Sequence, residues 1–286
     1  MRDAFTGEAT DSVIRWSEGR LETVDSVSAI EDPGAFLITA RAREMHAVRL
    51  YRMHLTAEGH IAGLDDVTYP VNQAEEMAFL ARTVASQHGG KVVYTVVERL
   101  GHSPSNPPQP GARLTPRTTL VCTVLGTGQV TRHTSQIPGV IDTLTWDARG
   151  RVLAYTLRAA DGNTLRTVDT TTAEDWVIDS RVIAAGASIY GNYIWSVISP
   201  SGQSIYAIAA RSGPQGSMLI ELPVIRGRSP RILARERTHT WNRLCINRAG
   251  HYLLLFSSDR IHRVSLPAGE VTEVSAMTRP VAWAAW

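Results

Sequence analysis

Five stretches of the chain share one pattern of hydrophobic and polar positions: an apolar run, a short polar turn ending in glycine, and a second apolar run. Runs of this length, rich in β-branched and aromatic residues and bounded by turn residues, predict antiparallel strand pairs. The glycines recur at intervals of 48 to 60 residues, which indicates a repeat architecture. The five glycines that end the turns are Gly34, Gly90, Gly150, Gly202 and Gly250.

Two further positions keep their character relative to the turn glycine. Three residues after it stands an aliphatic residue in every unit: Leu37, Val93, Leu153, Ile205 and Leu253. Three residues before it stands a polar residue suited to turns: Glu31, Gln87, Asp147, Ser199 and Asn247. In the later units two more strand-like runs follow the hairpin, such as SMLIELPVI and PRILARE after the fourth. Four antiparallel strands per unit, repeated around an axis, predict the blades of a β-propeller.

The two ends of the chain fit the same repeat. Residues 281–286 resemble the first strand of a unit, with Trp286 at the register of Trp146, and residues 2–24 hold three short strand-like runs that lack a first strand. Together they predict a sixth blade that closes the ring. The sequence thus predicts one all-β domain over 1–286: a six-bladed β-propeller of four-stranded antiparallel blades, closed by a C-terminal strand plus N-terminal strands.

One segment fits two structures. Residues 72–86 place Met77, Leu80, Ala81 and Val84 at helical spacing, whereas the repeat register requires strand over 84–86. The sequence leaves both interpretations open.

The segments TWDARGRVLAYT, AIEDPGAFLITA and VISPSGQSIYAIAA resemble the strand–turn–strand signature of TolB-like and WD-repeat-like bacterial six-bladed propellers, in particular those of actinobacterial type. None of them has the full SPDG turn of that signature. The resemblance implies the fold and says little of function, because that family includes scaffolds, periplasmic factors and gating domains of peptidases. Some actinobacterial members look like regulators paired with sigma factors, which implies a role in transcriptional or signalling regulation.

Charge and cysteine usage narrow the choice of partners and compartment. Lys plus Arg total 29 and Asp plus Glu total 27, a balance that argues against a dedicated nucleic-acid binder. The sequence has no apolar stretch typical of a signal peptide and no run long enough to span a membrane. Cys122 and Cys245 lie in apolar runs, as buried thiols of a reducing compartment do. We expect a cytoplasmic monomer that binds neither nucleic acid nor a membrane.

Sequence motifs that identify a reaction are missing. There is no HExxH, no P-loop and no GxGxxG after a strand, and the nine histidines show no spacing typical of metal ligands. We therefore expect no catalytic residues, no metal and no cofactor.

Arginine recurs at one register. It stands nine residues after the turn glycine in three units and next to that position in the other two: Arg43, Arg99, Arg211, Arg158 and Arg260. In a blade this register is the end of the second strand, where the side chains would form a positive rim suited to an acidic protein surface or an anionic ligand. The alternative is that the recurrence reflects amino-acid composition alone, because Lys91 is the only lysine and nearly every basic position of the chain is therefore an arginine.

A second set of candidates stands near the starts of the innermost strands: Asp142, Tyr190, Tyr193, His239, Trp241 and Asn242.

The sequence leaves two candidate functions. The first is a non-catalytic scaffold that recognises a protein partner, expected to have an acidic surface, through its loop face, in transcriptional or signalling regulation. The alternative is a small-molecule-binding protein or enzyme with a site at the mouth of the central channel, where His239 and Asp142 could act as acid and base if the ring brings them together.

Overall fold

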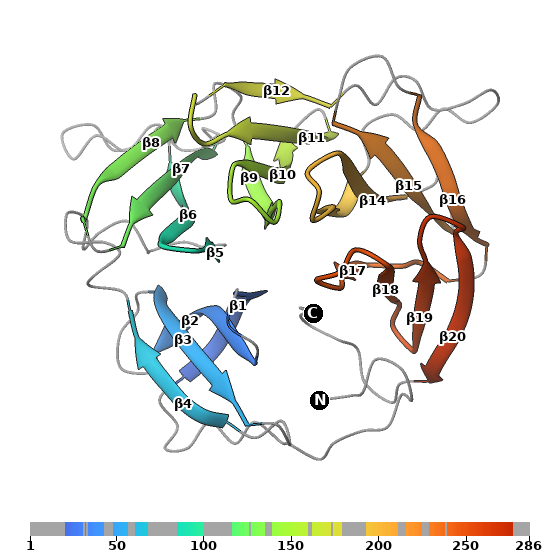
Figure 1. Ribbon diagram of the computed structural model, residues 1–286, viewed down its shortest axis with the longest axis horizontal. Helices are drawn as coiled ribbons and strands as arrows, with labels where there is room; N and C mark the ends of the chain where they lie inside the picture. The colour runs from blue at the N-terminus through green and yellow to red at the C-terminus, as the bar shows by residue number, and fades with distance from the viewer. Residues whose placement is uncertain are drawn as a thin grey trace, which may run out of the picture.

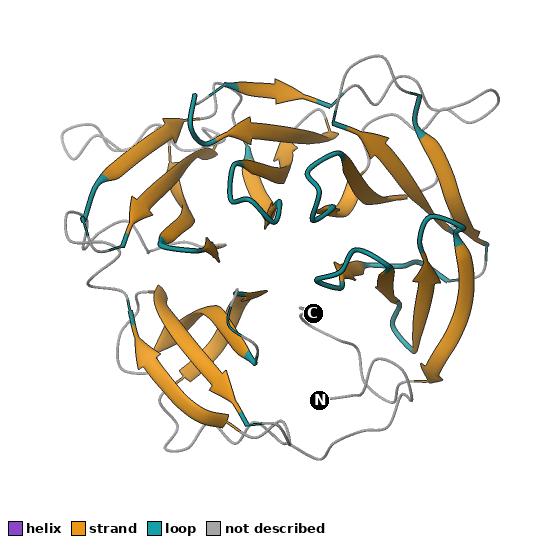
Figure 2. Cartoon of the chain, in the orientation of Figure 1, coloured by secondary structure: helices purple, strands orange, loops and turns teal. Residues whose placement is uncertain are grey.

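The computed structural model describes residues 21–30, 32, 34–42, 48–56, 61–67, 85–99, 116–125, 127–134, 139–159, 162–172, 174–178, 193–210, 216–224, 229–237 and 239–276. They form five four-stranded antiparallel sheets arranged as blades around a common centre (Figure 1, Figure 2). Within these ranges, no helix has the length and apolar character needed to cross a membrane.

Each blade is a meander whose strand order follows the chain. The first blade holds β1 (Leu21–Ala29), β2 (Ala35–Ala42), β3 (Val48–Leu55) and β4 (Ile61–Asp66). The second holds β5 (Ala85–His88), β6 (Lys91–Arg99), β7 (Pro116–Val124) and β8 (Val130–Thr134). The third holds β9 (Val140–Trp146), β10 (Val152–Ala159), β11 (Gly162–Asp169) and β12 (Asp175–Val177). The fourth holds β13 (Tyr193–Ile198), β14 (Ser204–Ala210), β15 (Ser217–Pro223) and β16 (Arg231–Glu236). The fifth holds β17 (Arg243–Ile246), β18 (Tyr252–Phe256), β19 (Arg260–Ser265) and β20 (Glu270–Ala276).

The innermost strands β1, β5, β9, β13 and β17 follow one another around the centre (Figure 1). This meander gives the ring two distinct ends. We call the end that carries the hairpin turns between first and second strands, and between third and fourth strands, the turn face. The opposite end, where second strands lead to third strands and one blade leads to the next, is the loop face.

The hydrophobic core lies between neighbouring blades. One cluster joins Leu165 of the third blade to Ile220 of the fourth, and another joins Leu219 of the fourth to Leu255 of the fifth. The aliphatic position three residues after each turn glycine is at most 1% exposed in all five units, as the repeat pattern predicted. Bulky side chains from facing sheets therefore fill the wedges between blades, and their burial stabilises the ring.

In the part of the chain that the structure describes there are five blades, where the sequence predicted six. Residues 21–24, assigned to the sixth blade, instead begin β1 of the first blade, where Leu21 pairs with Ala42. No turn separates these residues from the rest of β1, so the chain continues as one strand through two register shifts. The remaining residues assigned to the sixth blade, 2–20 and 281–286, lie outside the described residues.

The hairpin of the second blade shows which interpretation is right for part of the segment 72–86, for which the sequence left helix and strand open. Ala85–His88 forms strand β5, which confirms the repeat register at that point, while residues 72–84 lie outside the described residues. His88 pairs directly with Lys91, so this turn is shorter than the other four. In this turn Gly89, with φ of 55°, takes the left-handed conformation.

Candidate functional site

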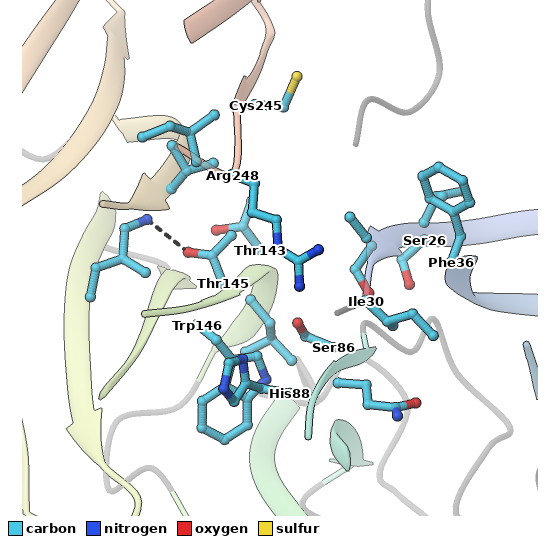
Figure 3. A pocket seen from close by; sticks show the side chains of 18 of the residues that line it. Ser26, Ile30, Phe36, Ser86, His88, Thr143, Thr145, Trp146, Cys245 and Arg248 are labelled. Atoms are coloured by element: carbon cyan, nitrogen blue, oxygen red, sulfur yellow. Dashed lines mark hydrogen bonds between the residues drawn. The ribbon is translucent and has the colours of Figure 1, made fainter. Parts of the chain in front are cut away.

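A cavity of about 460 Å³ occupies the channel and is lined by the innermost strands of all five described blades (Figure 3). Much of its wall is apolar, with Val27, Ile30, Val197 and Leu244 among the lining residues. Its volume lies within the range of about 300–1,000 Å³ typical of small-molecule sites.

One register position of the repeat encircles this cavity at the turn face. The residue two places before each turn glycine lines the cavity in every unit, and we call this set the turn collar. Its members are Asp32, His88, Ala148, Pro200 and Arg248. The collar is chemically asymmetric, because a carboxylate, an imidazole, two uncharged side chains and a guanidinium occupy equivalent places.

The polar residue one place earlier in the repeat shapes the turn itself. Asp147 Oδ1 accepts hydrogen bonds from the backbone N–H groups of Arg151 and Val152, at 2.8 and 2.9 Å. Asn247 Oδ1 makes the equivalent pair in the fifth blade, also at 2.8 and 2.9 Å. Ser199 Oγ accepts one such bond at 3.1 Å. These side chains therefore stabilise the turns and are committed to the fold.

Consecutive turns also interlock across blades. The N–H of Ala148 donates to the carbonyl oxygen of Pro200 in the next blade, at 2.8 Å. Gly150 adopts φ of 62°, and a Cβ added to it would lie 2.2 Å from the His88 ring of the preceding blade. Only glycine fits both the backbone conformation and the close approach. These contacts pack the turns of the second, third and fourth blades closely against one another.

Buried hydroxyl groups join the third and fourth blades along the channel. Ser196 Oγ lies 2.9 Å from Thr156 Oγ1 and 3.3 Å from Thr143 Oγ1, and these three side chains are at most 3% exposed. Thr145 Oγ1 accepts the N–H of Ile198 at 3.0 Å. These bonds satisfy polar groups that would otherwise be buried at a cost.

The structure brings together one candidate from each set predicted from the sequence. Asp142 lines the cavity, and its Oδ1 accepts a hydrogen bond of 3.3 Å from Nη2 of Arg158, one of the predicted rim arginines. The Asp142 side chain is 15% exposed, whereas that of Arg158 is 54% exposed. The guanidinium therefore presents its remaining donors to solvent while it neutralises the half-buried carboxylate.

The other described mouth candidates have structural partners. Trp241 is buried, and its Nε1 donates to Nδ1 of His262 at 3.3 Å; burial lowers the pKa of His262 and so favours the neutral ring that accepts this bond. His239 Nδ1 lies 3.7 Å from Asp259 Oδ1, and His239 does not line the cavity. Asn242 donates its backbone N–H to a carbonyl oxygen of β18 at 2.8 Å.

Two of the mouth candidates are not described at the level of their side chains. Tyr190 lies outside the described residues, and Tyr193 begins β13 without a described side chain. In the described parts of the chain, no three His, Cys, Asp or Glu side chains gather where they could hold a metal ion.

The predicted arginine rim is described at two of its five positions. Arg260 Nη1 lies 2.9 Å from Glu273 Oε2, and Arg260 Nε lies 3.6 Å from Asp259 Oδ2. Together with Arg158, these contacts make the described rim a set of ion pairs in which each positive charge has a carboxylate neighbour. Arg43 and Arg211 lie outside the described residues, and Arg99 ends β6 without a described side chain.

Arg248 is a charged cavity residue that the sequence patterns did not single out. It projects into the channel from the turn after β17 (Figure 3). The one available signal was its position two residues before a turn glycine, a register whose residue types do not recur.

No protein-family model and no curated protein matches this chain. Solved structures do. The putative TolB from Agrobacterium tumefaciens is 12% identical with a TM-score of 0.60, and the match covers 92% of this chain and 86% of that one. TolB from Acinetobacter baumannii is 12% identical with a TM-score of 0.58, over 91% of this chain and 55% of that one. A chain of the nidogen/laminin complex is 14% identical with a TM-score of 0.57, over 88% and 82%.

These similarities confirm the TolB-like β-propeller fold. At such identities they show the fold alone. The chain spans little more than half the length of the Acinetobacter protein.

Proposed function

We propose that this protein is a non-catalytic β-propeller scaffold that recognises a protein partner through its loop face, in transcriptional or signalling regulation. One observation carries the proposal. The charged side chains described at the loop face form partly exposed ion pairs, whereas Asp147, Ser199 and Asn247 at the turn face accept hydrogen bonds from the backbone of their own turns. Arg158 and Arg260 are 54% and 41% exposed there.

In such ion pairs, the carboxylates of a partner protein can bind the guanidinium group beside, or in place of, the protein's own carboxylate. A guanidinium carries five donors in a fixed fork, and Arg158 directs only part of its fork to Asp142. Exposed ion pairs stabilise a fold by about 0–1 kcal/mol, so a partner can replace or extend them at small cost. The partner would accordingly present acidic side chains, and its binding would weaken as salt rises.

The proposal is tested by affinity capture from native lysate with two matched double variants. Arg158→Ala with Arg260→Ala removes the described rim. Arg151→Ala with Arg231→Ala removes two arginines that are 64% and 50% exposed and ion-paired on the turn-face side. We expect the wild-type protein and the control to retain one acidic partner at low salt, and the rim variant to lose it with an unchanged melting temperature. Equal recovery by all three proteins would refute the rim as the binding surface.

The cavity supports a second candidate, the binding of a small molecule in the channel. Its volume of about 460 Å³ and its largely apolar wall suit a ligand. The described mouth residues favour binding over acid–base catalysis, because Asp142 is bonded to Arg158 and the carboxylate beside His239 is Asp259.

A further inference from the structure

We propose that the turn-face end of the channel binds a small carboxylic acid with an apolar body, whose carboxylate is held by Arg248. This site is distinct from the loop face that the proposed partner would occupy. It does not depend on the mouth residues that the sequence singled out.

The Arg248 guanidinium has the position and the freedom that an anion site needs. In Figure 3 it extends into the cavity from the turn that follows β17. It forms no hydrogen bond or ion pair with any described residue, and the residue is exposed, so a ligand can reach it from solvent. A guanidinium fork matches the two oxygens of a carboxylate in geometry and charge.

The collar directs the anion to one side of the ring. Arg248 is its one permanently cationic member, since Asp32, His88, Ala148 and Pro200 hold the equivalent places. A carboxylate entering from the turn face would therefore be drawn to the fifth blade and away from Asp32 in the first.

Other polar groups of the cavity are compatible with this orientation. Asp147 is 4% exposed and accepts the N–H groups of its own turn through Oδ1, and Asp142 is paired with Arg158 at the loop-face end of the channel. Thr145 Oγ1 receives the N–H of Ile198, which leaves the hydroxyl proton available for donation to an oxygen of the ligand.

The apolar wall defines the rest of the ligand. Ile30, Val197, Ile198 and Leu244 line the cavity from the first, fourth and fifth blades. Burying a hydrocarbon or aromatic body against these side chains is favourable, and the volume of about 460 Å³ accommodates a bicyclic ring system.

Two probes that differ only in charge test the site. Naphthalene-2-carboxylate and naphthalene-2-carboxamide share one apolar body, and calorimetric titration measures the affinity of each. We expect the wild-type protein to bind the acid about 10-fold or more tightly than the amide, as a hydrogen-bonded charge pair implies. Arg248→Met should abolish this preference and leave the affinity for the amide unchanged.

The turn of the third blade offers a matched control. Arg149 is exposed in the turn of the third blade and does not line the cavity, so Arg149→Met should keep the full preference for the acid. Both variants should unfold at the wild-type temperature. Equal affinities of the wild-type protein for acid and amide, a preference that survives Arg248→Met, or no binding of either probe would each overturn the proposal.

Discussion

Two carboxylates at opposite ends of the ring, Asp147 and Asp259, have opposite roles. At the turn face, Asp147 is 4% exposed, and one of its carboxylate oxygens accepts hydrogen bonds from two backbone N–H groups. At the loop face, Asp259 has a side chain 45% exposed and lies beside Arg260 and His239. The same residue type is thus a structural part of a turn at one end and part of a surface charge cluster at the other.

This difference separates the residues that hold the ring from those that can recognise a partner. A buried acceptor serving two N–H groups cannot be removed without leaving those donors unsatisfied. An exposed ion pair can be removed with little loss, because water replaces both partners. Removing a buried acceptor such as Asp147 at the turn face should therefore destabilise the fold, whereas removing an exposed arginine at the loop face should change binding with little loss of stability.

The largest loss is expected for Gly150→Ala. The alanine would have to adopt φ of 62° and place its Cβ 2.2 Å from the His88 ring. We expect the free energy of unfolding in urea to fall by about 2–5 kcal/mol, from backbone strain and overpacking together. Adding His88→Ala should recover the overpacking part only. Wild-type stability of Gly150→Ala would show that the turns do not interlock.

A smaller loss is expected for Asp147→Ala. The change leaves the N–H groups of Arg151 and Val152 without their acceptor, which should lower the free energy of unfolding by about 1–3 kcal/mol. Asp147→Asn keeps an oxygen at Oδ1 and should lose less than half as much. If both variants lose the same amount in urea titrations, charge rather than hydrogen bonding holds the turn.

Acid should reveal a second carboxylate of the turn face. Burial raises the pKa of Asp169, but hydrogen bonds from Arg151 and from the N–H groups of Thr171 and Thr172 outweigh it and lower the pKa below 3.8. Because the folded-state pKa is the lower one, the carboxylate stabilises the fold above about pH 4, and this contribution is lost as the pH falls through the folded-state value.

The urea midpoints of the wild-type protein and Asp169→Asn measure this contribution. We expect a gap at pH 7 that narrows as the pH falls below about 4 and the wild-type carboxyl becomes protonated. A gap that stays constant across this range would mean that Asp169 stabilises the turn by hydrogen bonding that the amide cannot replace.

The smallest effect on stability is expected at the loop face. Arg158→Ala breaks a pair in which the arginine is 54% exposed, and the free energy of unfolding should change by no more than about 1 kcal/mol. A larger loss would mean that the half-buried Asp142 needs this guanidinium, and the contrast between the two ends would fail.

Much of the fold followed from short-range signals in the sequence. Each turn glycine lies between two apolar runs, so the hairpins could be predicted within their own segments, and the buried aliphatic position followed from the same register. The sixth blade depended on pairing between distant ends of the chain. Residues 21–24 were misassigned because their apolar pattern fits a separate strand as well as the start of β1.

The candidate site was less predictable. The recurrence of arginine near one register of the repeat pointed to Arg158 and Arg260. Their carboxylate partners depend on how the strands pair: Glu273, for example, reaches Arg260 from β20. Recurrence also missed Arg248, because the collar carries a different residue type in each blade. A repeat pattern reveals what the blades share, whereas an asymmetric site depends on what they do not share.

Hydrogen exchange on the complex captured from lysate tests the central claim most directly, because it reports which end of the ring the partner covers. We predict slower exchange, relative to the free protein, around Arg158 and Arg260, and unchanged exchange in the turns that contain Asp147 and Asn247. Protection confined to those turns, with the loop face exchanging as in the free protein, would contradict the account.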